Sequence, residues 1–375
     1  ATPTRLAPEA TATPTTPAIA QASLEPTGEA ATEERPAEAT ATAGVEETTS
    51  LEATPVEATA EETPTLSSAP TPAEASVPTP EALPDYASRD QPLGRGQEAL
   101  GGRLFFPVYD EARGTYNIFQ ANADGSGRRL VQTEASQPSL NDAGDLIAFR
   151  SWQADRRGLI SRPLSGGDPW RFVIFFEAAR PIWGAGNEFF LYHSRESGEI
   201  PAIYRTVGEI GEVLRRDGAP IQGESPDWLP DGRFVYRGCF NGCGLIISNL
   251  DGSFPVMLTT HASDTAPAVS PDGSQIAFMS QRDGNWEVYV IDVDGQNLTR
   301  LTNEPENDGL PTWSPDGNHV AFVSDRDGEW EMWAATPGGE DPRVLFPLGG
   351  PIDGVVQVDV ANSRGWTEER IDWVP

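Results

Sequence analysis

Carboxylates that recur in one local setting are the first candidates for chemistry in this chain. Asp272 and Asp316 each stand third in the tetrapeptide SPDG, at 270–273 and 314–317. Two such copies could mark a chemical site, or a turn that the chain uses repeatedly. Serine first, proline second and glycine fourth are the residues that a type I turn prefers. We therefore interpret the following as turn residues and not as catalysts: Pro271, Asp272, Gly273, Pro315, Asp316 and Gly317.

The two cysteines, Cys239 and Cys243 in RGCFNGCG, could form a disulfide, half of a metal site or a redox pair. Zinc needs four ligands, and the three histidines lie far off along the chain. A redox pair is more usual as Cys-x-x-Cys at the start of a helix, whereas strand-like runs flank this segment. Residues 240–242 then read as a hairpin tip. We favour a cross-strand disulfide, which would indicate a compartment outside the cytosol, over two free thiols.

The composition removes several classes of function. The chain has no lysine, so a Schiff-base lysine and the lysine of a phosphate-binding loop are excluded. Neither G-x-S-x-G nor H-E-x-x-H occurs, and DVDGQN (292–297) lacks the spacing of a calcium loop. A net charge of −31 makes nucleic acid an unsuitable partner. We expect no catalytic residue, no metal and no cofactor.

The turns and the cysteines belong to a sequence repeat that runs along the chain. Pro138, Pro181, Pro226, Pro267 and Pro311 head equivalent short runs at intervals of 41–45 residues. After each run come a turn, an alternating run such as SQIAFMS, a polar loop, a third run, a second tight turn and a fourth run. Four short strands in such a period predict an all-β propeller. A tryptophan recurs in the first run, and we expect it in the core between blades.

The number of blades follows from the two ends of the repeat. Residues 101–132 match the second to fourth strands of the unit and lack a first strand. The final residues, IDWVP (371–375), match the first strand and stop where the turn would begin. We predict six blades, with the C-terminus closing the ring, since closure leaves no free strand edge. Residues 347–370 exceed a normal connection and are either an insertion or part of an irregular seventh blade.

The repeats resemble the TolB-like six-bladed propellers, which are built from Pro-Asp-containing repeats and are relatives of WD-type propellers. The match is best over 265–338, where APAVSPDGSQIAF and LPTWSPDGNHVAF occur. It is fair over 220–260 and weak over 101–220, where LNDAGD and WGAGNE replace the turn. The resemblance implies the fold but no single function, because the family includes secreted and periplasmic scaffolds and propellers attached to peptidases.

In the layout that the resemblance implies, the SPDG turns lie on one face and the long polar loops on the other. The loops of the fifth and sixth blades carry the charges Arg282, Asp283, Glu304, Glu306, Asp308, Asp325, Arg326 and Asp327. These could form an acidic rim that binds a cation, a basic peptide or a partner protein. Alternatively, Arg282 and Arg326 pair with nearby aspartates to order their own loops, and the rest is solvated surface, the commoner meaning of exposed charges.

Residues 1–90 differ sharply from the rest of the chain. They are almost all Ala, Thr, Pro and Glu, too poor in apolar side chains to order a backbone. We expect a disordered acidic stalk over 1–95, followed by the propeller over 96–375. The sequence begins at Ala1 rather than Met and has no stretch near the ~20 apolar residues of a membrane span, so an upstream signal or anchor stays open.

Together these features predict a non-catalytic binding or scaffold module outside the cytosol: secreted, periplasmic or anchored at the cell surface. We expect a monomer with protein partners of the cell envelope, and membrane contact only through an upstream anchor. Two alternatives stay open: a hydrolase or lyase acting on a polysaccharide in the propeller channel, and the sensor domain of a membrane-anchored signalling protein. Convergent carboxylates and a histidine in the channel would favour the enzyme, and apolar first strands filling it would argue against it.

Overall fold

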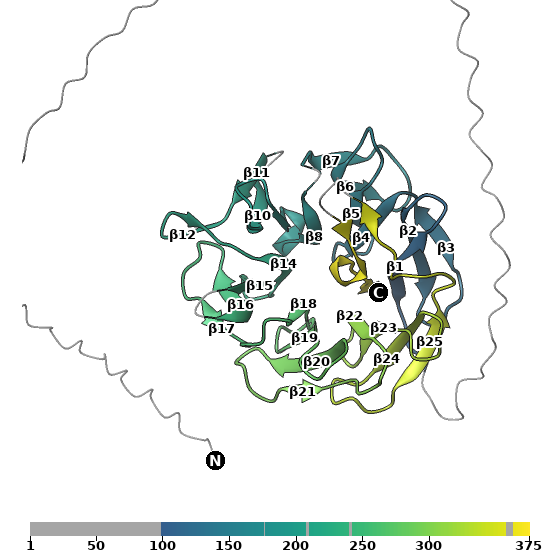
Figure 1. The fold of residues 1–375 in the computed structure, drawn as a ribbon. Coiled ribbons are helices and arrows are strands. Elements are labelled where there is room, and N and C mark those ends of the chain that lie inside the picture. The colour runs from purple at the N-terminus through teal and green to yellow at the C-terminus, as the bar shows by residue number, and fades with distance from the viewer. Residues whose placement is uncertain (1–98, 176, 208–209, 240–241, 358–362) are drawn as a thin grey trace, which may run out of the picture. The chain divides into compact units, whose positions relative to one another are not determined.

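The computed structural model describes residues 99–375 apart from 176, 208–209, 240–241 and 358–362, so the stalk predicted over 1–95 lies outside the described residues. Six four-stranded antiparallel sheets are arranged as blades around a common centre (Figure 1). The first strand of each blade lies next to this centre and the fourth lies at the rim. The all-β, six-bladed propeller predicted from the repeat is therefore confirmed.

Five blades are continuous in the chain and follow the period of the prolines. The second blade has β4 (Ala135–Leu140), β5 (Leu146–Ser151), β6 (Gly158–Pro163) and β7 (Trp170–Val173). The third has β8 (Ala179–Trp183), the short helix η1 (Ala185–Asn187), β9 (Phe190–Ser194), β10 (Ala202–Val207) and β11 (Ile210–Val213). The fourth has β14 (Glu224–Trp228), β15 (Arg233–Cys239), β16 (Cys243–Asn249) and β17 (Val256–Met257). The fifth has β18 (Thr265–Val269), β19 (Gln275–Ser280), β20 (Glu287–Asp292) and β21 (Thr299–Arg300). The sixth has β22 (Asp308–Trp313), β23 (Val320–Ser324), β24 (Glu331–Ala335) and β25 (Arg343–Pro347).

The first blade is built from both ends of the propeller. Its first strand, β28 (Asp372–Val374), pairs antiparallel with β1 (Arg103–Asp110), and Trp373 lies opposite Leu104. The sheet continues through β2 (Thr115–Asn122) and β3 (Arg129–Gln132). The predicted closure is confirmed, and β28 covers the edge of β1 that would otherwise be free.

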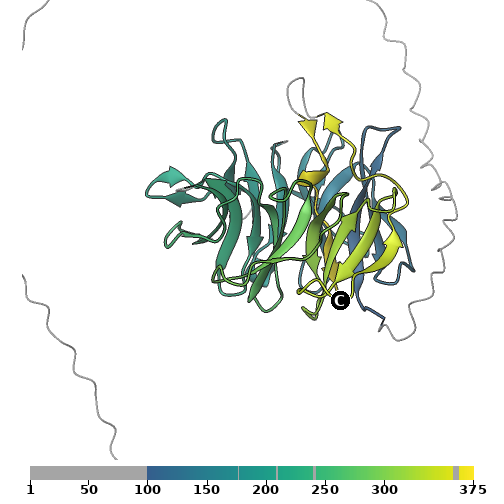
Figure 2. The same ribbon diagram turned by 60° about the horizontal axis from the view of Figure 1, so that its bottom comes forward.

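The segment before β28 is an insertion at the closure. Within 347–370, β26 (Val356–Gln357) pairs with β27 (Ser363–Arg364) as a two-stranded ribbon, and the short helix η2 (Trp366–Glu368) follows. Figure 2 shows this ribbon standing out from the face opposite the C-terminus. Its described residues join no four-stranded sheet, so the alternative of a seventh blade is wrong. No helix among the described residues has the length and apolar character needed to cross a bilayer.

The core lies between neighbouring blades and holds the recurring tryptophan. The indole N–H of Trp183, on the first strand of the third blade, donates to the Ser139 carbonyl on the first strand of the second blade at 3.1 Å. Trp313 makes the same bond to Ala268 at 2.9 Å, from the sixth blade to the fifth. Both indoles are buried, and β4 and β22 are buried at every position. The ring is thus packed with side chains and is not an open tube.

A bulge interrupts the first strand of five blades directly before its proline. The residues there have left-handed φ angles between 51° and 57°: Gln137, Arg180, Ser225, Ala266 and Leu310. The register with the second strand shifts at the same place in all five blades. A bulge turns backbone groups out of the ladder, and three of these N–H groups meet side-chain acceptors near the centre of the ring, as described below.

Candidate binding face

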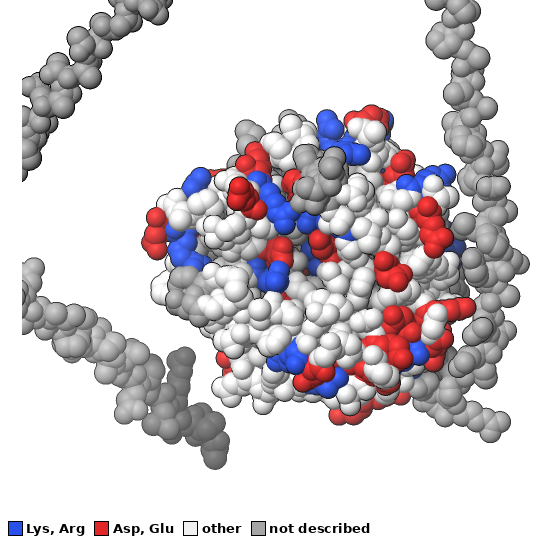
Figure 3. Space-filling model, viewed as in Figure 1, with Lys and Arg blue, Asp and Glu red and all other residues white. Residues whose placement is uncertain are grey.

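The propeller has two faces with different chemistry. The loops between the second and third strands, together with the ribbon of β26 and β27, lie on the face seen in Figures 1 and 3, which we call the loop face. The turns between the first and second strands lie on the opposite face, which we call the turn face. In Figure 3, Asp and Glu side chains gather at the lower right, over the blade of β22–β25, while basic and acidic side chains surround the middle of the face.

The SPDG segments form tight turns on the turn face. The Gly273 N–H donates to the Ser270 carbonyl at 2.8 Å, and Gly317 donates to Ser314 at 2.8 Å. The Ser270 hydroxyl also donates to Asp272 at 2.7 Å. Hydrogen bonds from the Ser274 backbone and from the Ser270 and Ser274 hydroxyls lower the pKa of Asp272. The Asp272 carboxylate is thus hydrogen-bonded within its own turn, and the Asp316 carboxylate accepts a hydrogen bond from the Ser314 hydroxyl at 2.6 Å.

On the loop face, two arginines of the predicted rim form buried ion pairs. Arg326 donates to both oxygens of Asp308 at 2.9 Å, and Arg282 donates to both oxygens of Asp264 at 2.7 Å. The two aspartate side chains are fully buried. Each guanidinium also lies over aromatic rings of its own blade, namely Phe278, Tyr289, Phe322 and Trp333. These pairs fasten each loop to the start of its first strand, so their role is to hold the loops in place.

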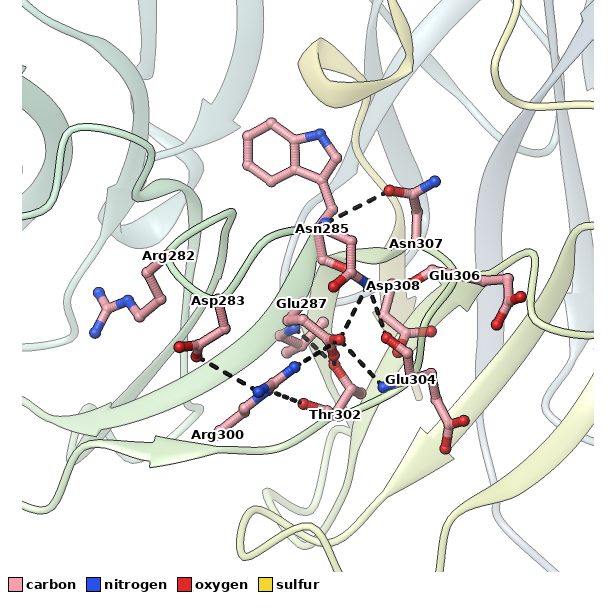
Figure 4. Close-up of polar contacts among 12 residues, drawn as sticks. Arg282, Asp283, Asn285, Glu287, Arg300, Thr302, Glu304, Glu306, Asn307 and Asp308 are labelled. Atoms are coloured by element: carbon pink, nitrogen blue, oxygen red, sulfur yellow. Dashed lines mark hydrogen bonds and ion pairs between the residues drawn. The ribbon is translucent and has the colours of Figure 1, made fainter.

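Glu287, at the start of β20, is a fully buried carboxylate that was not among the residues predicted from the sequence. It accepts hydrogen bonds from Arg300 at 2.9 Å, from the Thr302 hydroxyl at 2.5 Å and from the Glu304 N–H at 3.1 Å (Figure 4). Asn285 donates to the same carboxylate at 3.0 Å. Because these partners lie on both sides of the loop, Glu287 fixes the course of the chain that carries Glu304. The signal was available, since Glu331 follows tryptophan at the equivalent place in the next repeat.

Three further rim carboxylates already have partners. Asp283 accepts the Tyr289 hydroxyl and lies 3.6 Å from Arg300. Asp325 accepts the Asn307 N–H at 2.7 Å. Glu304 is half-exposed, with one carboxylate oxygen 3.6 Å from an Arg326 nitrogen. Arginines therefore partly neutralise the charges of Asp283 and Glu304, and hydrogen bonds from Asn307 hold the Asp325 side chain.

The remaining rim carboxylates, Glu306 and Asp327, are exposed. Within the described part of the chain, neither lies within ion-pair distance of an arginine or histidine. Near Asp327, Glu329 is exposed and Glu331 is half-buried. Burial, and then the nearby charge of Asp327, raise the pKa of Glu331. The sixth blade therefore presents a local excess of negative charge on a rigid support.

The centre of the loop face holds a second charged cluster, which was not predicted from the sequence. Arg364 of the insertion donates to Glu177 at 2.8 Å and to Glu368 at 2.7 Å. Arg370 lies 3.3 Å from Asp227 on the fourth blade. These side chains join the insertion to the connection between the second and third blades and to the fourth blade. The partners are 143 to 187 residues apart in the chain, except for the local pair of Arg364 with Glu368.

The bulge N–H groups complete this cluster. The Gln137 N–H donates to Glu369 at 3.1 Å, the Arg180 N–H to the Gln137 side chain at 2.7 Å, and the Ser225 N–H to His193 Nδ1 at 3.1 Å. Burial and the surrounding arginines hold the pKa of His193 well below 6.5, so the ring is neutral. Burial raises the pKa of Glu369 to about 8. The channel thus has convergent carboxylates and a histidine, but the chain's own donors occupy them.

The cysteines lie on the loop face, in the fourth blade. A disulfide joins Cys239 at the end of β15 to Cys243 at the start of β16, and the two residues are directly paired across the strands. Residues 240–241 of the predicted hairpin tip lie outside the described residues. Among the residues that are described, no group of three or more His, Cys, Asp or Glu side chains is arranged to hold a metal ion.

Comparisons with known proteins agree with this architecture. Residues 212–347 match the family described as the TolB beta propeller domain. TolB from Acinetobacter baumannii superposes with a TM-score of 0.61 at 18% identity, over 74% of this chain and 68% of that one. The proposed TolB from Agrobacterium tumefaciens gives 0.51 at 18% identity, over 74% and 100%. Kuenenia stuttgartiensis hydrazine synthase gives 0.50 at 12% identity, over 74% and 47%. At these identities the structural likeness concerns the fold alone.

Proposed function

Because the described part of residues 99–375 forms a six-bladed propeller and residues 212–347 match the TolB beta propeller domain, we propose that the protein is a non-catalytic, extracytoplasmic binding module. It recognises a basic surface of a partner protein with the loop face of its fifth and sixth blades. The single observation that carries this proposal is a pair of exposed carboxylates, Glu306 and Asp327, on loops that buried ion pairs hold in place. Neither carboxylate has a cationic partner among the residues that the structure describes.

Rigid presentation is what makes this charge useful for recognition. An exposed ion pair within one protein contributes little to stability, because solvent screens it and both side chains lose freedom. Loops that are already held in place lose less freedom when a partner binds. Opposite charge on the partner also raises the association rate and fixes its orientation. The sixth blade therefore favours an arginine- or lysine-rich partner over a neutral one.

The proposed compartment rests on different residues. A disulfide such as Cys239–Cys243 persists where the surroundings are oxidising, outside the cytosol. We propose that residues 1–95 act as a stalk that holds the propeller away from a surface, because an extended Pro-rich segment spans ~3.1 Å per residue. The partner is then a protein of the cell envelope, and the propeller acts as a monomer.

The channel supports a second candidate, an enzyme acting on a polysaccharide, since it holds carboxylates and His193. General acid–base catalysis needs a group that is free to exchange a proton with the substrate. The Nδ1 atom of His193 accepts the Ser225 N–H, and Glu177 and Asp227 face arginines. A hydrolase would have to displace Arg364 and Arg370 first. The binding role is therefore the better supported of the two.

The test uses a matched pair of double variants in the full chain. Glu306→Gln with Asp327→Asn removes two charges from the loop face. Asp142→Asn with Glu188→Gln removes the same two side-chain types from exposed turns on the turn face. Binding of a fluorescent nona-arginine peptide is measured at low salt, and cross-linking of a photoreactive form locates the contact. Both variants keep the acidic residues 1–95, so any binding there is common to them.

Losing two carboxylate contacts, each worth roughly 0.3–1 kcal/mol, should weaken binding at the propeller by about 3- to 30-fold. The turn-face variant should stay within about twofold of the parent. Cross-links should fall in 303–307 and 325–331. Equal losses in both variants, or cross-links confined to residues outside the loop face, would show that net charge alone attracts the peptide.

A further inference from the structure

A pocket between the first and second blades lies apart from both charged clusters. It encloses about 260 Å³ on the loop face and is lined by Arg113, Thr115, Glu134, Trp152, Arg157 and Val356, among others. Val356 belongs to β26, so the insertion ribbon supplies one wall. This ribbon belongs to none of the four-stranded blades. The pocket is therefore built by the insertion together with the first and second blades.

The backbone around Glu134 is fixed in a demanding conformation. Its φ of 49° is left-handed, which non-glycine residues rarely adopt. Its N–H donates to the Asn117 side chain at 3.0 Å, and its carbonyl accepts the Trp152 N–H at 2.8 Å. These two backbone hydrogen bonds, one to each blade, thus fix the position of the Glu134 backbone. Among the described residues, the Glu134 carboxylate has no ion-pair partner, and neither does the guanidinium of Arg157.

Thr115 gives the observation that points to a ligand. Its side chain lies in the wall with only 5% of the residue exposed, and its hydroxyl has no hydrogen-bond partner among the described residues. A buried hydroxyl without a partner is unfavourable in an otherwise packed protein. A ligand with a polar group at this depth would satisfy it.

The groups in the pocket define the ligand's chemistry. Arg157 offers a guanidinium to a carboxylate, a pairing that Arg favours through two parallel hydrogen bonds. Glu134 accepts from hydroxyl groups, and Thr115 can donate or accept. Trp152 and Val356 add apolar surface, while the indole N–H of Trp152 is already bound to Ser136 at 3.0 Å. The volume is below the range of about 300–1,000 Å³ that drug-sized ligands occupy.

We propose that this pocket binds a single acidic sugar unit, a hexuronic acid. The carboxylate pairs with Arg157, the ring hydroxyls bond to Glu134 and Thr115, and the carbon face of the ring covers Trp152. A neutral hexose lacks the first of these contacts. A free amino acid could pair with Arg157 and Glu134 but has no ring to cover the apolar wall.

Saturation-transfer NMR on the full chain, with glucuronate, glucose and alanine as probes, tests the proposal. Glucuronate should bind at least tenfold more tightly than glucose or alanine. Arg157→Gln should weaken glucuronate binding at least fivefold, and Arg156→Gln, which alters the neighbouring exposed arginine outside the pocket, should change it less than twofold. Thr115→Val should weaken binding without lowering the melting temperature, because it removes only an unpartnered hydroxyl.

Three results would overturn this assignment. Glucuronate that shows no transfer at millimolar concentration does not bind. Equal effects of Arg156→Gln and Arg157→Gln would mean that net charge, and not the pocket, attracts the acid. Alanine binding as tightly as glucuronate would assign the pocket to an amino acid. None of these results bears on the acidic loops, whose test uses a different probe and different residues.

Discussion

Replacing Trp373 with alanine should destabilise the whole ring, because this residue joins the last strand of the chain to the first blade. Trp373 is 5% exposed and packs in the cluster that unites the first and sixth blades. Its indole N–H donates to the Gly101 carbonyl at 3.0 Å. Its backbone pairs opposite Leu104 in the three-residue ladder between β28 and β1. The substitution leaves the ladder in place and removes the side chain that anchors it.

The expected loss follows from burial. Truncating a buried tryptophan to alanine costs about 3–5 kcal/mol, which includes the cavity that is left and the lost hydrogen bond. For domains of 150–250 residues, 1 kcal/mol shifts the melting temperature by about 2–4 °C. The variant should therefore melt roughly 6–20 °C below the parent. Trp170→Ala is the matched control, because Trp170 lies on the outermost strand of the second blade and is 43% exposed.

Thermal melts followed by circular dichroism compare the two variants, and the control should lose less than half as much. A chain ending at Ile371 extends the test, since it lacks β28 and the bond from the Leu140 N–H to Asp372 at 2.6 Å. This truncation should lower the melting temperature further than Trp373→Ala does. A truncated chain that melts within 2 °C of the parent, or equal shifts for both tryptophans, would refute closure by β28.

Three further predictions concern buried charges and the disulfide. Asp308→Asn leaves the Arg326 guanidinium without its buried partner and should lower the free energy of unfolding in urea by about 3–5 kcal/mol. The double variant with Arg326→Gln should lose less than the sum of the two single losses. Additive losses would show that the two side chains do not interact. Burial raises the pKa of Glu369 to about 8. Between the unfolded pKa near 4.5 and pH 8, the native state therefore binds one proton more than the unfolded state. This contribution to stability is fully present below pH 4.5 and is lost as the pH rises through 8. Glu369→Gln should therefore become more stable relative to the parent at pH 9 than at pH 5, and a difference independent of pH would contradict the burial argument. Thiol titration of the denatured, unreduced protein should find no free thiol at Cys239 and Cys243. Because the disulfide closes a short loop, it contributes only about 2 kcal/mol to stability. Two titrating thiols would show that the disulfide does not form.

Local turn chemistry made the fold predictable. Ser, Pro and Gly have strict positions in a type I turn, so SPDG marked the strand boundaries and the prolines marked the blades. The same count identified IDWVP as the missing first strand. The ribbon of β12 (Arg215–Arg216) and β13 (Ala219–Pro220) was missed, although its Asp217–Gly218 turn is a hairpin signal with both φ angles positive. The bulges before the prolines were missed because their backbone conformation has no residue-type signature: the five residues there share no common side chain.

Contacts of the candidate site could be predicted only where both partners lie close together in the chain and recur in successive repeat units. Pairing of Arg282 and Arg326 with nearby aspartates was one of the two interpretations of these loops, and their partners lie 18 residues earlier in the chain. Arg364 with Glu177 and Gln137 with Glu369 lie 187 and 232 residues apart. Such contacts arise from closure of the ring, and no local pattern encodes which blade faces the insertion. The binding role of the acidic rim stays a prediction.

The insertion explains why the loops, and not the channel, are the better place for a partner. Arg364 and Arg370 form ion pairs across the channel mouth. They lie only a few residues before β28, the strand that closes the ring. A ligand that entered the channel would have to separate these pairs, and leaving a buried charge unpaired costs several kcal/mol. The same displacement would pull on the strand that closes the ring. Glu306 and Asp327 carry no such penalty, because binding there breaks no ion pair among the described residues and leaves the closure undisturbed.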